Sequence, residues 1–217
     1  MTADAASASS PAVMDRLKAE TRDAHAAAES IPFNQALVDG RLPLERYVAQ
    51  LAAYRLMHDA LEHALAESDH PAIRAVWRED LRKVALLDRD LEVLSGAEDP
   101  GTTTAASAVA SDVAGRIQAL AIADPVALLG ALYVLEGSTL GGTILRRHLA
   151  TAFDLEEDRG LSYYSSYGNN VMPHWREFRE RMNGAVTDPA EQERVLEAAR
   201  TAFDDVGRIL SSLSASL

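Results

Sequence analysis

His25 has neighbours that suit an axial metal ligand. Ala24 precedes it, three further alanines follow it, and Glu29 comes four residues later. On a helix, residues four apart share a face, so the Glu29 carboxylate can accept a hydrogen bond from the His25 ring. Such a bond fixes the tautomer of a metal-bound imidazole and raises its basicity. The alternative is a histidine beside an incidental carboxylate, which is the commoner case for a lone histidine.

Glycines interrupt a segment whose flanks favour a helix. Gly137, Gly141 and Gly142 lie within six residues, and each glycine inside a helix costs about 1 kcal/mol relative to alanine. One explanation is a backbone that must approach a ligand closely. The other is tight packing between helices, because Gly137 and Gly141 are one turn apart. Ser138 between them could orient a water molecule, or could bond to the carbonyl one turn back.

Basic residues lie near the first of these features and on a later predicted helix. Lys18 and Arg22 precede the histidine, and Arg176, Arg179 and Arg181 follow in the C-terminal third. Arginine suits paired recognition of carboxylates, so these residues are candidates for binding an anionic ligand. The alternative is a solvated helix face whose charges have no binding role.

A fourth group raises the question of a metal bound by the protein alone. His58, Asp59, Glu62 and His63 lie on one predicted helix. A di-iron site needs a Glu-x-x-His pair from each of two helices, and the chain does not supply two such pairs. A di-iron centre is therefore disfavoured. No nucleophile motif, phosphate loop or dinucleotide fingerprint is present in the sequence.

The elements that must position these residues are helical almost throughout. Apolar residues recur at steps of three and four, and no segment alternates for long enough to predict a strand. Asp124-Pro125 and Asp188-Pro189 are typical helix starts. The Ser/Gly/Pro/Thr-rich stretch 95–104 and the segment 154–168 are predicted loops. The expected helices cover 13–28, 32–40, 43–67, 72–94, an alanine-rich segment ending near 122, 125–153, 172–183 and a last helix from 189.

Composition limits the class of protein. The chain has 217 residues, 47% of them apolar and 25% charged, which favours one globular domain over a disordered chain. Its 21 basic and 33 acidic residues give a net charge of −12, so it lacks the basic field that holds nucleic acid. There are no cysteines, which excludes disulfides and zinc–thiolate sites.

The apolar stretches and the first residues of the chain predict its location in the cell. The longest apolar stretches, as around 126–135, have about ten residues, against the roughly 18–20 that a membrane span needs. Residues 1–12 are small and polar and do not form a signal peptide. We expect a flexible tail over 1–12 and a single all-α domain of seven or eight helices over 13–217, in a cytoplasmic protein with no membrane insertion.

Three segments, in this order, resemble the haem oxygenases. Leu17 to His25, followed by Ala28-Glu29, is similar to the family's proximal helix, which implies that His25 is the axial iron ligand and Glu29 its hydrogen-bonding carboxylate. Tyr133 to Gly142 is similar to the distal helix, whose glycines let the backbone lie over the haem. The run from Arg181 through Phe203 is similar to the last helix, so the resemblance covers about 13–210.

Two departures from the family pattern concern the groups around the haem. The animal enzymes have an aspartate where this chain has Ser138, as in a bacterial branch with Gly-Ser-x-Leu-Gly, and a tyrosine where it has His58. Proton delivery is then expected to use different groups, with His58 among them. A basic residue that helps to hold the propionates is replaced by Trp175, while Arg179 keeps its matching position.

The resemblance implies an all-α haem-oxygenase-like bundle that holds haem, as both substrate and cofactor, between a proximal and a distal helix. It implies oxidative ring opening to biliverdin with release of carbon monoxide and ferrous iron. Dioxygen and an external electron donor are expected partners, the donor being a ferredoxin, a flavin reductase or an ascorbate-like reductant. The expected catalytic residues are His25, Ser138, Gly137, Gly141 and His58, and the expected haem-binding residues are Lys18, Thr21, Arg22, Ala28, Glu29, Gly142, Arg179 and Phe203.

Two other functions fit parts of the pattern. A non-catalytic haem carrier or sensor would bind haem through His25 without activating dioxygen. A haem-independent relative would act on thiamin-like pyrimidines or use a di-iron site, and the missing cysteine and iron-ligand pairs count against both versions. Because one fold serves several functions, the site residues must decide.

Overall fold

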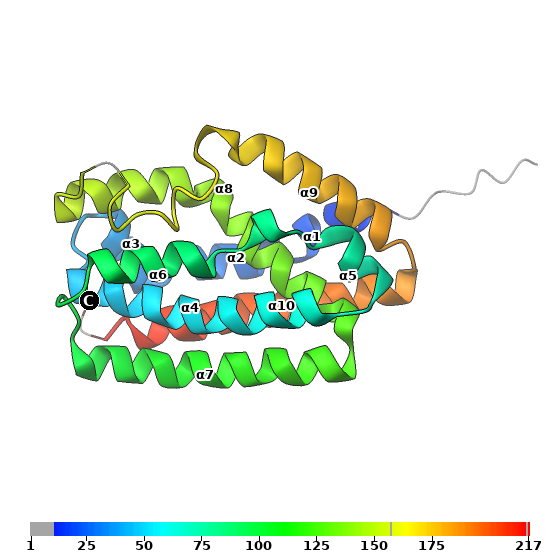
Figure 1. The fold of residues 1–217 in the computed structure, drawn as a ribbon, viewed down its shortest axis with the longest axis horizontal. Helices are drawn as coiled ribbons and strands as arrows, with labels where there is room; N and C mark the ends of the chain where they lie inside the picture. Colours follow the sequence, from blue (N-terminus) through cyan, green and yellow to red (C-terminus); the bar gives the residue numbers. More distant parts are fainter. Residues whose placement is uncertain (1–10, 157, 216) are drawn as a thin grey trace, which may run out of the picture.

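A computed structural model describes residues 11–156, 158–215 and 217, and within these residues it contains helices and turns but no strand (Figure 1). The all-α prediction is confirmed. Most of the tail expected over 1–12 lies outside the described residues. The α-helices are α1 (Val13–Glu20), α2 (Arg22–Glu29), α3 (Pro32–Val38), α4 (Leu44–Glu67), α5 (Pro71–Val76), α6 (Val84–Val93), α7 (Pro100–Ala123), α8 (Leu128–Phe153), α9 (Val171–Ala185) and α10 (Pro189–Ser212).

Long helices form the body of the molecule. Helix α4 packs along α7, and α10 packs against both α7 and α8. Figure 1 shows α8 and α9 above this layer. The backbones of α8 and α10 touch where they cross, because a side chain at Gly130 would lie 2.2 Å from the Val195 carbonyl oxygen. One continuous core, which includes the fully buried Phe33, Tyr47 and Phe178, joins these helices.

The helix expected over 13–28 is two helices that meet at Thr21. The Thr21 hydroxyl donates a hydrogen bond to the Leu17 carbonyl at 2.7 Å, one turn back. This type of bond bends helices, and Thr21 itself leaves the helical conformation, with φ −106° and ψ 5°. The bend allows α2 to take a direction different from that of α1.

The single helix expected over 72–94 is wrong. The chain forms α5, a 3-10 turn over Glu79–Leu81 and then α6. The Glu62 carboxylate of α4 accepts hydrogen bonds from the backbone N–H groups of Lys83 and Val84, at 2.6 and 3.1 Å. A tertiary partner thus replaces the helical hydrogen bonds that the local pattern predicted.

Side-chain caps fix two other boundaries. Asp99 accepts a hydrogen bond from the Thr102 N–H at 2.7 Å, so α7 begins at Pro100 and the second half of the loop expected over 95–104 is helical. Asp188 caps α10 as predicted, by accepting the Glu191 N–H at 2.9 Å. Asp124 makes no cap bond; its carboxylate pairs with Arg194 at 3.0 Å instead.

The loop predicted over 154–168 is confirmed for the residues that the structure describes there, and a buried aspartate anchors it. Asp90 of α6 is fully buried, and its carboxylate accepts the backbone N–H groups of Ser162 and Tyr163, at 2.7 and 2.8 Å. This loop lies against α8, because a side chain at Gly142 would meet the Tyr164 carbonyl oxygen at 2.9 Å. The tyrosines of the loop are therefore held at fixed positions behind α8.

By length and composition alone, the helical segment Pro125–Phe153 is apolar enough to cross a membrane. Its most apolar window has a mean hydropathy of 1.4, and half of that window is buried inside the protein. A core helix passes the same test, so the observation is weak evidence for a membrane span.

Candidate functional site

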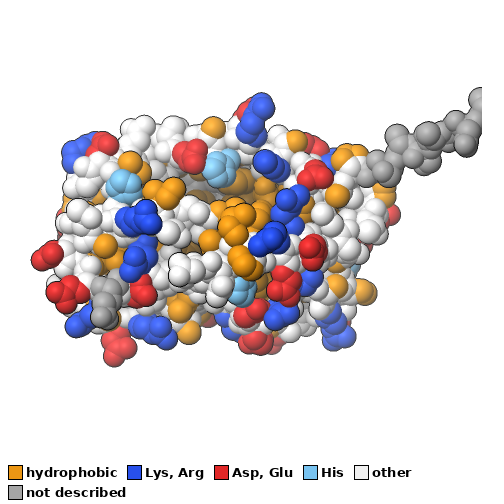
Figure 2. Space-filling model, turned by 90° about the horizontal axis from the view of Figure 1, so that it is seen from above, with side chains coloured by type: hydrophobic (Ala, Val, Ile, Leu, Met, Phe, Trp, Pro, Cys, Tyr) orange, Lys and Arg blue, Asp and Glu red, His pale blue; other side chains and the backbone are white. Residues whose placement is uncertain are grey.

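One face of α8 is left without a packing partner. At Gly141 an added side chain would meet nothing within 4 Å. Leu140 and Ile144, on the same face, are 37% and 61% exposed. Figure 2 shows the side of the molecule that carries α8 and α9, where hydrophobic side chains lie in a hollow with Lys and Arg side chains along its margin. We call this hollow the cleft. Unpartnered apolar surface of this kind marks a binding site.

On the proximal side, α2 presents His25 to solvent. Its ring contacts Phe203 of α10 edge-on, with 5.8 Å between ring centroids. The His25 Nδ1 atom faces Glu29 Oε2 at 3.6 Å, slightly beyond hydrogen-bonding distance, and the two side chains are 60% and 72% exposed. Within the described residues no group bonds to the other ring nitrogen, Nε2. The geometry therefore leaves Nε2 available to an incoming ligand, with the Glu29 carboxylate near Nδ1.

Tyr133 connects the proximal and distal sides. It lies one turn before Gly137 on α8, its hydroxyl bonds to Thr21 at the α1–α2 junction, and its ring packs against Trp175 at 6.0 Å. Burial raises the pKa of Tyr133, and the nearby Arg179 opposes that rise. The Trp175 ring also reaches the Gly137 backbone, at 3.6 Å from where a side chain would begin. These contacts position α1, α8 and α9 relative to one another.

The predicted basic residues lie on exposed parts of α1, α2 and α9. Among the described residues Lys18 forms no ion pair. Arg22 pairs with Asp23 at 3.3 Å, and Arg179 with Asp15 at 3.0 Å. Exposed pairs of this kind contribute little and are readily exchanged. All three cations are therefore accessible to an anionic ligand.

Two further predicted residues are placed differently. Ala28 is half-buried, and its carbonyl accepts a hydrogen bond from the Asn34 amide at 2.8 Å. Gly142 is buried against the Tyr164 carbonyl, so packing explains why it has no side chain. Gly142 thus serves packing against a loop, whereas Gly141 borders open space and is not packed against another helix. Contact of Gly142 with a ligand stays a prediction.

The predicted residues Ser138 and His58 have different partners, and that of His58 is a residue that the sequence analysis did not single out. Ser138 is an exposed residue, and its hydroxyl donates to the Leu135 carbonyl at 2.7 Å, as the alternative interpretation expected. The buried His58 ring has its Nε2 atom 3.1 Å from the Tyr163 oxygen. The available signal for Tyr163 was only the tyrosine-rich composition of its loop.

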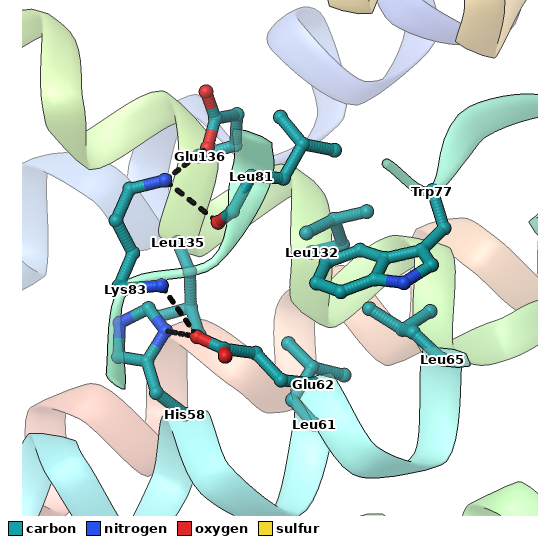
Figure 3. Close-up of a pocket in the computed structure, with 10 residues that line it drawn as sticks. All are labelled: His58, Leu61, Glu62, Leu65, Trp77, Leu81, Lys83, Leu132, Leu135 and Glu136. Atoms are coloured by element: carbon teal, nitrogen blue, oxygen red, sulfur yellow. Dashed lines mark hydrogen bonds and ion pairs between the residues drawn. The ribbon is translucent and has the colours of Figure 1, made fainter. Parts of the chain in front are cut away.

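A second buried polar group lies behind α8 (Figure 3). Lys83 and Glu136 form an ion pair at 3.3 Å, and both side chains are 3% exposed. The Lys83 ammonium also donates to the Leu81 carbonyl and to the Tyr167 hydroxyl, each at 2.8 Å. Burial lowers the pKa of Lys83, while Glu136 opposes this shift. These residues line a small cavity together with His58 and Glu62.

Titration of the buried groups follows from their surroundings. Burial, with a smaller contribution from the Lys83 charge, lowers the pKa of His58 to about 3. Burial raises the pKa of the Glu62 carboxyl, opposed by the two backbone N–H groups it accepts. His58 is therefore a neutral imidazole at neutral pH. Across the described residues, no group of three or more His, Cys, Asp or Glu side chains could hold a metal ion.

Comparison with known proteins places this geometry in context. A family model described as Heme oxygenase matches residues 12–211. Heme oxygenase 1 of the chicken is 28% identical over 192 residues, which cover 86% of this chain and 64% of the chicken protein. Heme oxygenase 1 of a Nostoc cyanobacterium is 23% identical over 209 residues, which cover 94% of this chain and 86% of the relative.

Solved structures agree in fold. The heme oxygenase from Leptospira interrogans superposes with a TM-score of 0.84 at 23% identity, over 93% of this chain and 99% of that one. The heme oxygenase-1 from Synechocystis, solved in complex with heme, gives a TM-score of 0.81 at 20% identity, over 94% and 92% of the two chains. At these identities the superpositions establish the fold.

Proposed function

This chain belongs to the haem oxygenase family, and on that premise we propose that it opens the haem ring oxidatively to biliverdin and releases carbon monoxide and ferrous iron. The observation that carries the proposal is the exposed His25 imidazole, whose Nε2 atom is free while its Nδ1 atom faces Glu29. Family membership alone does not specify the site, so the residues around the cleft are the support for this activity.

The residues of the cleft fit haem. A flat, apolar macrocycle requires a surface free of bulky side chains, which Gly141 supplies because its side-chain position is empty space. The exposed Leu140 and Ile144 offer apolar contact on the same face. The imidazole of His25 is a suitable iron donor, since haem iron is commonly held by a histidine. The open space, the apolar side chains and the imidazole donor therefore all suit haem as the ligand.

His25 would hold the iron through Nε2, and Glu29 would keep the ring in place. When Glu29 accepts the Nδ1–H, the proton is fixed on Nδ1 and the lone pair on Nε2 points outward. A neutral imidazole lacks the electron push of a thiolate, which favours O–O cleavage. Bound haem supplies the redox chemistry and is also the substrate.

The glycine-bearing turn of α8 would set the space above the ring. A backbone without side chains at Gly137 and Gly141 can lie close to a planar ligand, and that closeness would limit the directions from which dioxygen approaches. Trp175, packed on Gly137, would close one side. The shape of this space, rather than a charged side chain, would then decide which position of the haem ring is attacked.

Lys18, Arg22 and Arg179 would pair with the haem propionates. These cations lie on α1, α2 and α9, and the carboxylates that pair with Arg22 and Arg179 are exposed. A local positive margin offsets the net charge of −12, which otherwise repels a dianionic ligand. The family has a basic residue at the position of Trp175, and this chain does not. Arg179 is therefore the cation that this part of α9 would contribute to propionate binding.

The remaining partners follow from the chemistry. The reaction consumes dioxygen, protons and electrons, and the sequence contains no flavin or iron–sulfur motif, so a separate donor such as a ferredoxin, a flavin reductase or an ascorbate-like reductant is proposed. The acidic composition supports neither nucleic-acid binding nor attachment to an anionic membrane surface. We place the protein in the cytoplasm.

The non-catalytic carrier is not favoured, because the matching family and the compared relatives are named as oxygenases. One experiment separates the two functions. Purified protein is mixed with one equivalent of hemin, and visible spectra are recorded before and after ascorbate is added in air.

The two functions predict different spectra. A Soret band typical of histidine-ligated haem, followed by bleaching and a broad red absorption, supports the enzyme. A persistent band under reductant identifies a carrier. No Soret shift on mixing contradicts the assignment of His25.

A further inference from the structure

We propose that Lys83 is a positioning residue, whose buried ammonium fixes the height of the glycine-bearing turn of α8 over the cleft and so narrows which position of the haem ring is attacked. The inference rests on the proposed function and extends it to a buried residue behind α8. It is carried by hydrogen bonds that join Lys83 to α4, to α8 and to the loop before α9.

Lys83 is held at both ends. Its backbone N–H donates to the Glu62 carboxylate of α4 at 2.6 Å. Its ammonium donates to the Glu136 carboxylate of α8 at 3.3 Å and to the Leu81 carbonyl at 2.8 Å (Figure 3). A third bond, also 2.8 Å long, goes to the Tyr167 hydroxyl. An ammonium has three donor hydrogens, so all of them are used, and the side chain has one defined position between α4 and α8.

The partner of Lys83 on α8 lies directly before the glycine-bearing turn. Glu136 precedes Gly137, and Gly141 follows one turn later. Glycine leaves the backbone freer than any other residue does, so this turn needs an anchor outside itself. Glu136 is buried, and its carboxylate therefore depends on partners inside the protein. The bond from Lys83 supplies such an anchor from within the core.

The same ammonium reaches the helix on the other margin of the cleft. Its nitrogen lies 4.5 Å from the centroid of the Tyr167 ring, which stacks on His174 of α9 with 4.2 Å between centroids. The next residue, Trp175, packs on Gly137, with its ring 3.6 Å from where a side chain would begin. Lys83 thus connects to the turn itself and to the helix that packs against it.

The ion pair is better suited to fixing a position than to adding stability. Lys83 and Glu136 are both buried, and the cost of taking two charges out of water offsets their attraction. Burial lowers the pKa of Lys83, which reflects this cost, although Glu136 opposes the shift. Apolar side chains could fill the same space without that cost. They would not fix a direction, because hydrophobic contact is non-directional.

A displaced turn would change the outcome of the proposed reaction. The height of the backbone at Gly137 and Gly141 sets the room above a bound ring, since Gly141 borders open space. A misplacement of about 1 Å is enough to alter the rate of a positioned reaction by about a hundredfold. If the turn could move, dioxygen would be directed less strictly and more than one ring position would be attacked.

The test compares wild type with two double variants. Lys83→Met/Glu136→Leu removes both charges at similar side-chain volume, so that no unpaired charge stays in the core. The control, Arg116→Met/Asp205→Leu, removes an ion pair between α7 and α10. Helix α7 lies on the opposite side of the molecule from α9 (Figure 1), so the control disturbs packing without touching the anchor of the turn.

Three measurements are made on each protein. Hydrogen exchange of the haem-free chain, detected by mass spectrometry, follows the peptide over 137–142 and a reference peptide around Gly130, which packs on the α10 backbone. Urea unfolding gives the midpoint and so reports overall stability. Each protein is then loaded with hemin, the Soret band is recorded, and the bilin isomers formed with dioxygen and ascorbate are separated by chromatography.

We expect Lys83→Met/Glu136→Leu to keep the Soret band of wild type and a urea midpoint no lower than that of wild type. Its amides over 137–142 should exchange faster by about tenfold or more, because the turn loses its anchor, while the reference peptide stays unchanged. The ratio of bilin isomers should change by about tenfold. Arg116→Met/Asp205→Leu should match wild type in exchange at this turn and in product.

Other outcomes would overturn the proposal. Wild-type exchange over 137–142 in Lys83→Met/Glu136→Leu would show that Lys83 does not hold the turn, and a wild-type ratio of isomers would show that the turn does not direct the reaction. Faster exchange along the whole chain with a lower urea midpoint would show that the pair serves stability alone. If wild type forms no bilin, the proposed function itself fails, and the exchange data still decide whether Lys83 anchors the turn.

Discussion

Two histidines of this chain show how surroundings decide the chemistry of one side-chain type. His25 has a 60% exposed side chain, and among the described residues nothing bonds to its Nε2 atom. His58 is buried, bonded through Nε2 to Tyr163, and stays neutral. A ligand can reach the first and not the second. The sequence showed both histidines beside carboxylates at helical spacing, so spacing alone did not separate them.

At the residue scale, we predict that His25→Ala loses the spectrum of histidine-ligated haem, because the imidazole donor is gone. Added imidazole should restore both the spectrum and ring opening by filling the space that the side chain leaves. His63→Ala is the matched control, since His63 is also exposed and also faces a carboxylate four residues on, Glu67 at 3.2 Å. Visible spectroscopy after hemin addition measures the result, and an unchanged His25→Ala spectrum would contradict the assignment.

At the scale of elements, α8 shows how one helix divides its glycines between close packing and an open surface. Gly130 touches the α10 backbone and Gly142 touches the Tyr164 carbonyl, whereas Gly141 has no neighbour within 4 Å. Helix α8 can therefore pack closely against α10 and the 154–168 loop on two faces, while the face that carries Gly141 has no packing partner. The helical period separates the two roles, because positions a turn apart share a face and adjacent positions do not.

We predict opposite effects for alanine at two of these glycines. Gly130→Ala should lower the free energy of unfolding by about 2 kcal/mol or more, because α8 and α10 must move apart to admit the methyl group. Gly141→Ala should raise it by up to about 1 kcal/mol, since alanine favours the helix and nothing is displaced. Urea unfolding of the haem-free proteins, followed by circular dichroism, measures both. Destabilisation by Gly141→Ala would show that this turn is packed.

A larger side chain at the same turn tests access to the cleft. Gly141→Leu should fold normally, because the space beside Gly141 is open, but it should reduce hemin turnover or change the bilin isomer by occupying the space above the ring. Chromatography of the bilin products measures the change. Turnover at the wild-type rate to the same product would show that the ligand does not approach α8 here.

At the scale of the whole molecule, acidic surface and buried polar groups coexist with one continuous core. Most ion pairs are exposed and contribute little. The buried Lys83–Glu136 pair is different, because removing either partner would leave a charge in the core without compensation. His58, Glu62 and Lys83 thus connect α4 with the segment before α6, and the stability of the molecule depends on how these groups titrate.

We predict that burial of His58 makes the protein sensitive to mild acid. Its pKa is about 3 when folded and about 6.5 when unfolded, so between these values the unfolded chain binds a proton that the native state does not. The associated stability is complete above pH 6.5 and is lost as the pH falls, by about 2 kcal/mol between pH 7 and pH 5.

Urea unfolding at the two pH values, for wild type and His58→Gln, checks this prediction. The variant should lose less stability on acidification by about that amount. The raised pKa of Glu62 acts in the opposite sense in both proteins, so the difference between them reports on His58. An equal loss in both proteins would show that His58 is accessible to protons.

The sequence by itself determined the helical class, most helix ends and the residues of the proximal helix. Helical periods and caps such as Asp188 depend on neighbours in the chain. Accordingly, α4 and α8 begin and end close to the predicted positions, and α10 begins at the predicted residue. The family resemblance was likewise carried by short motifs, and the match over residues 12–211 confirms it. The haem-binding roles of individual residues stay predictions.

Only the tertiary structure decided which polar groups meet. The helix expected over 72–94 is broken because Glu62, distant in sequence, takes the backbone N–H groups of Lys83 and Val84. Tyr163 comes to lie against His58 because Asp90 anchors its loop. Local patterns encode the propensity of a segment and the face it buries. They carry no information on a hydrogen-bond partner a hundred residues away, which is fixed when the helices pack.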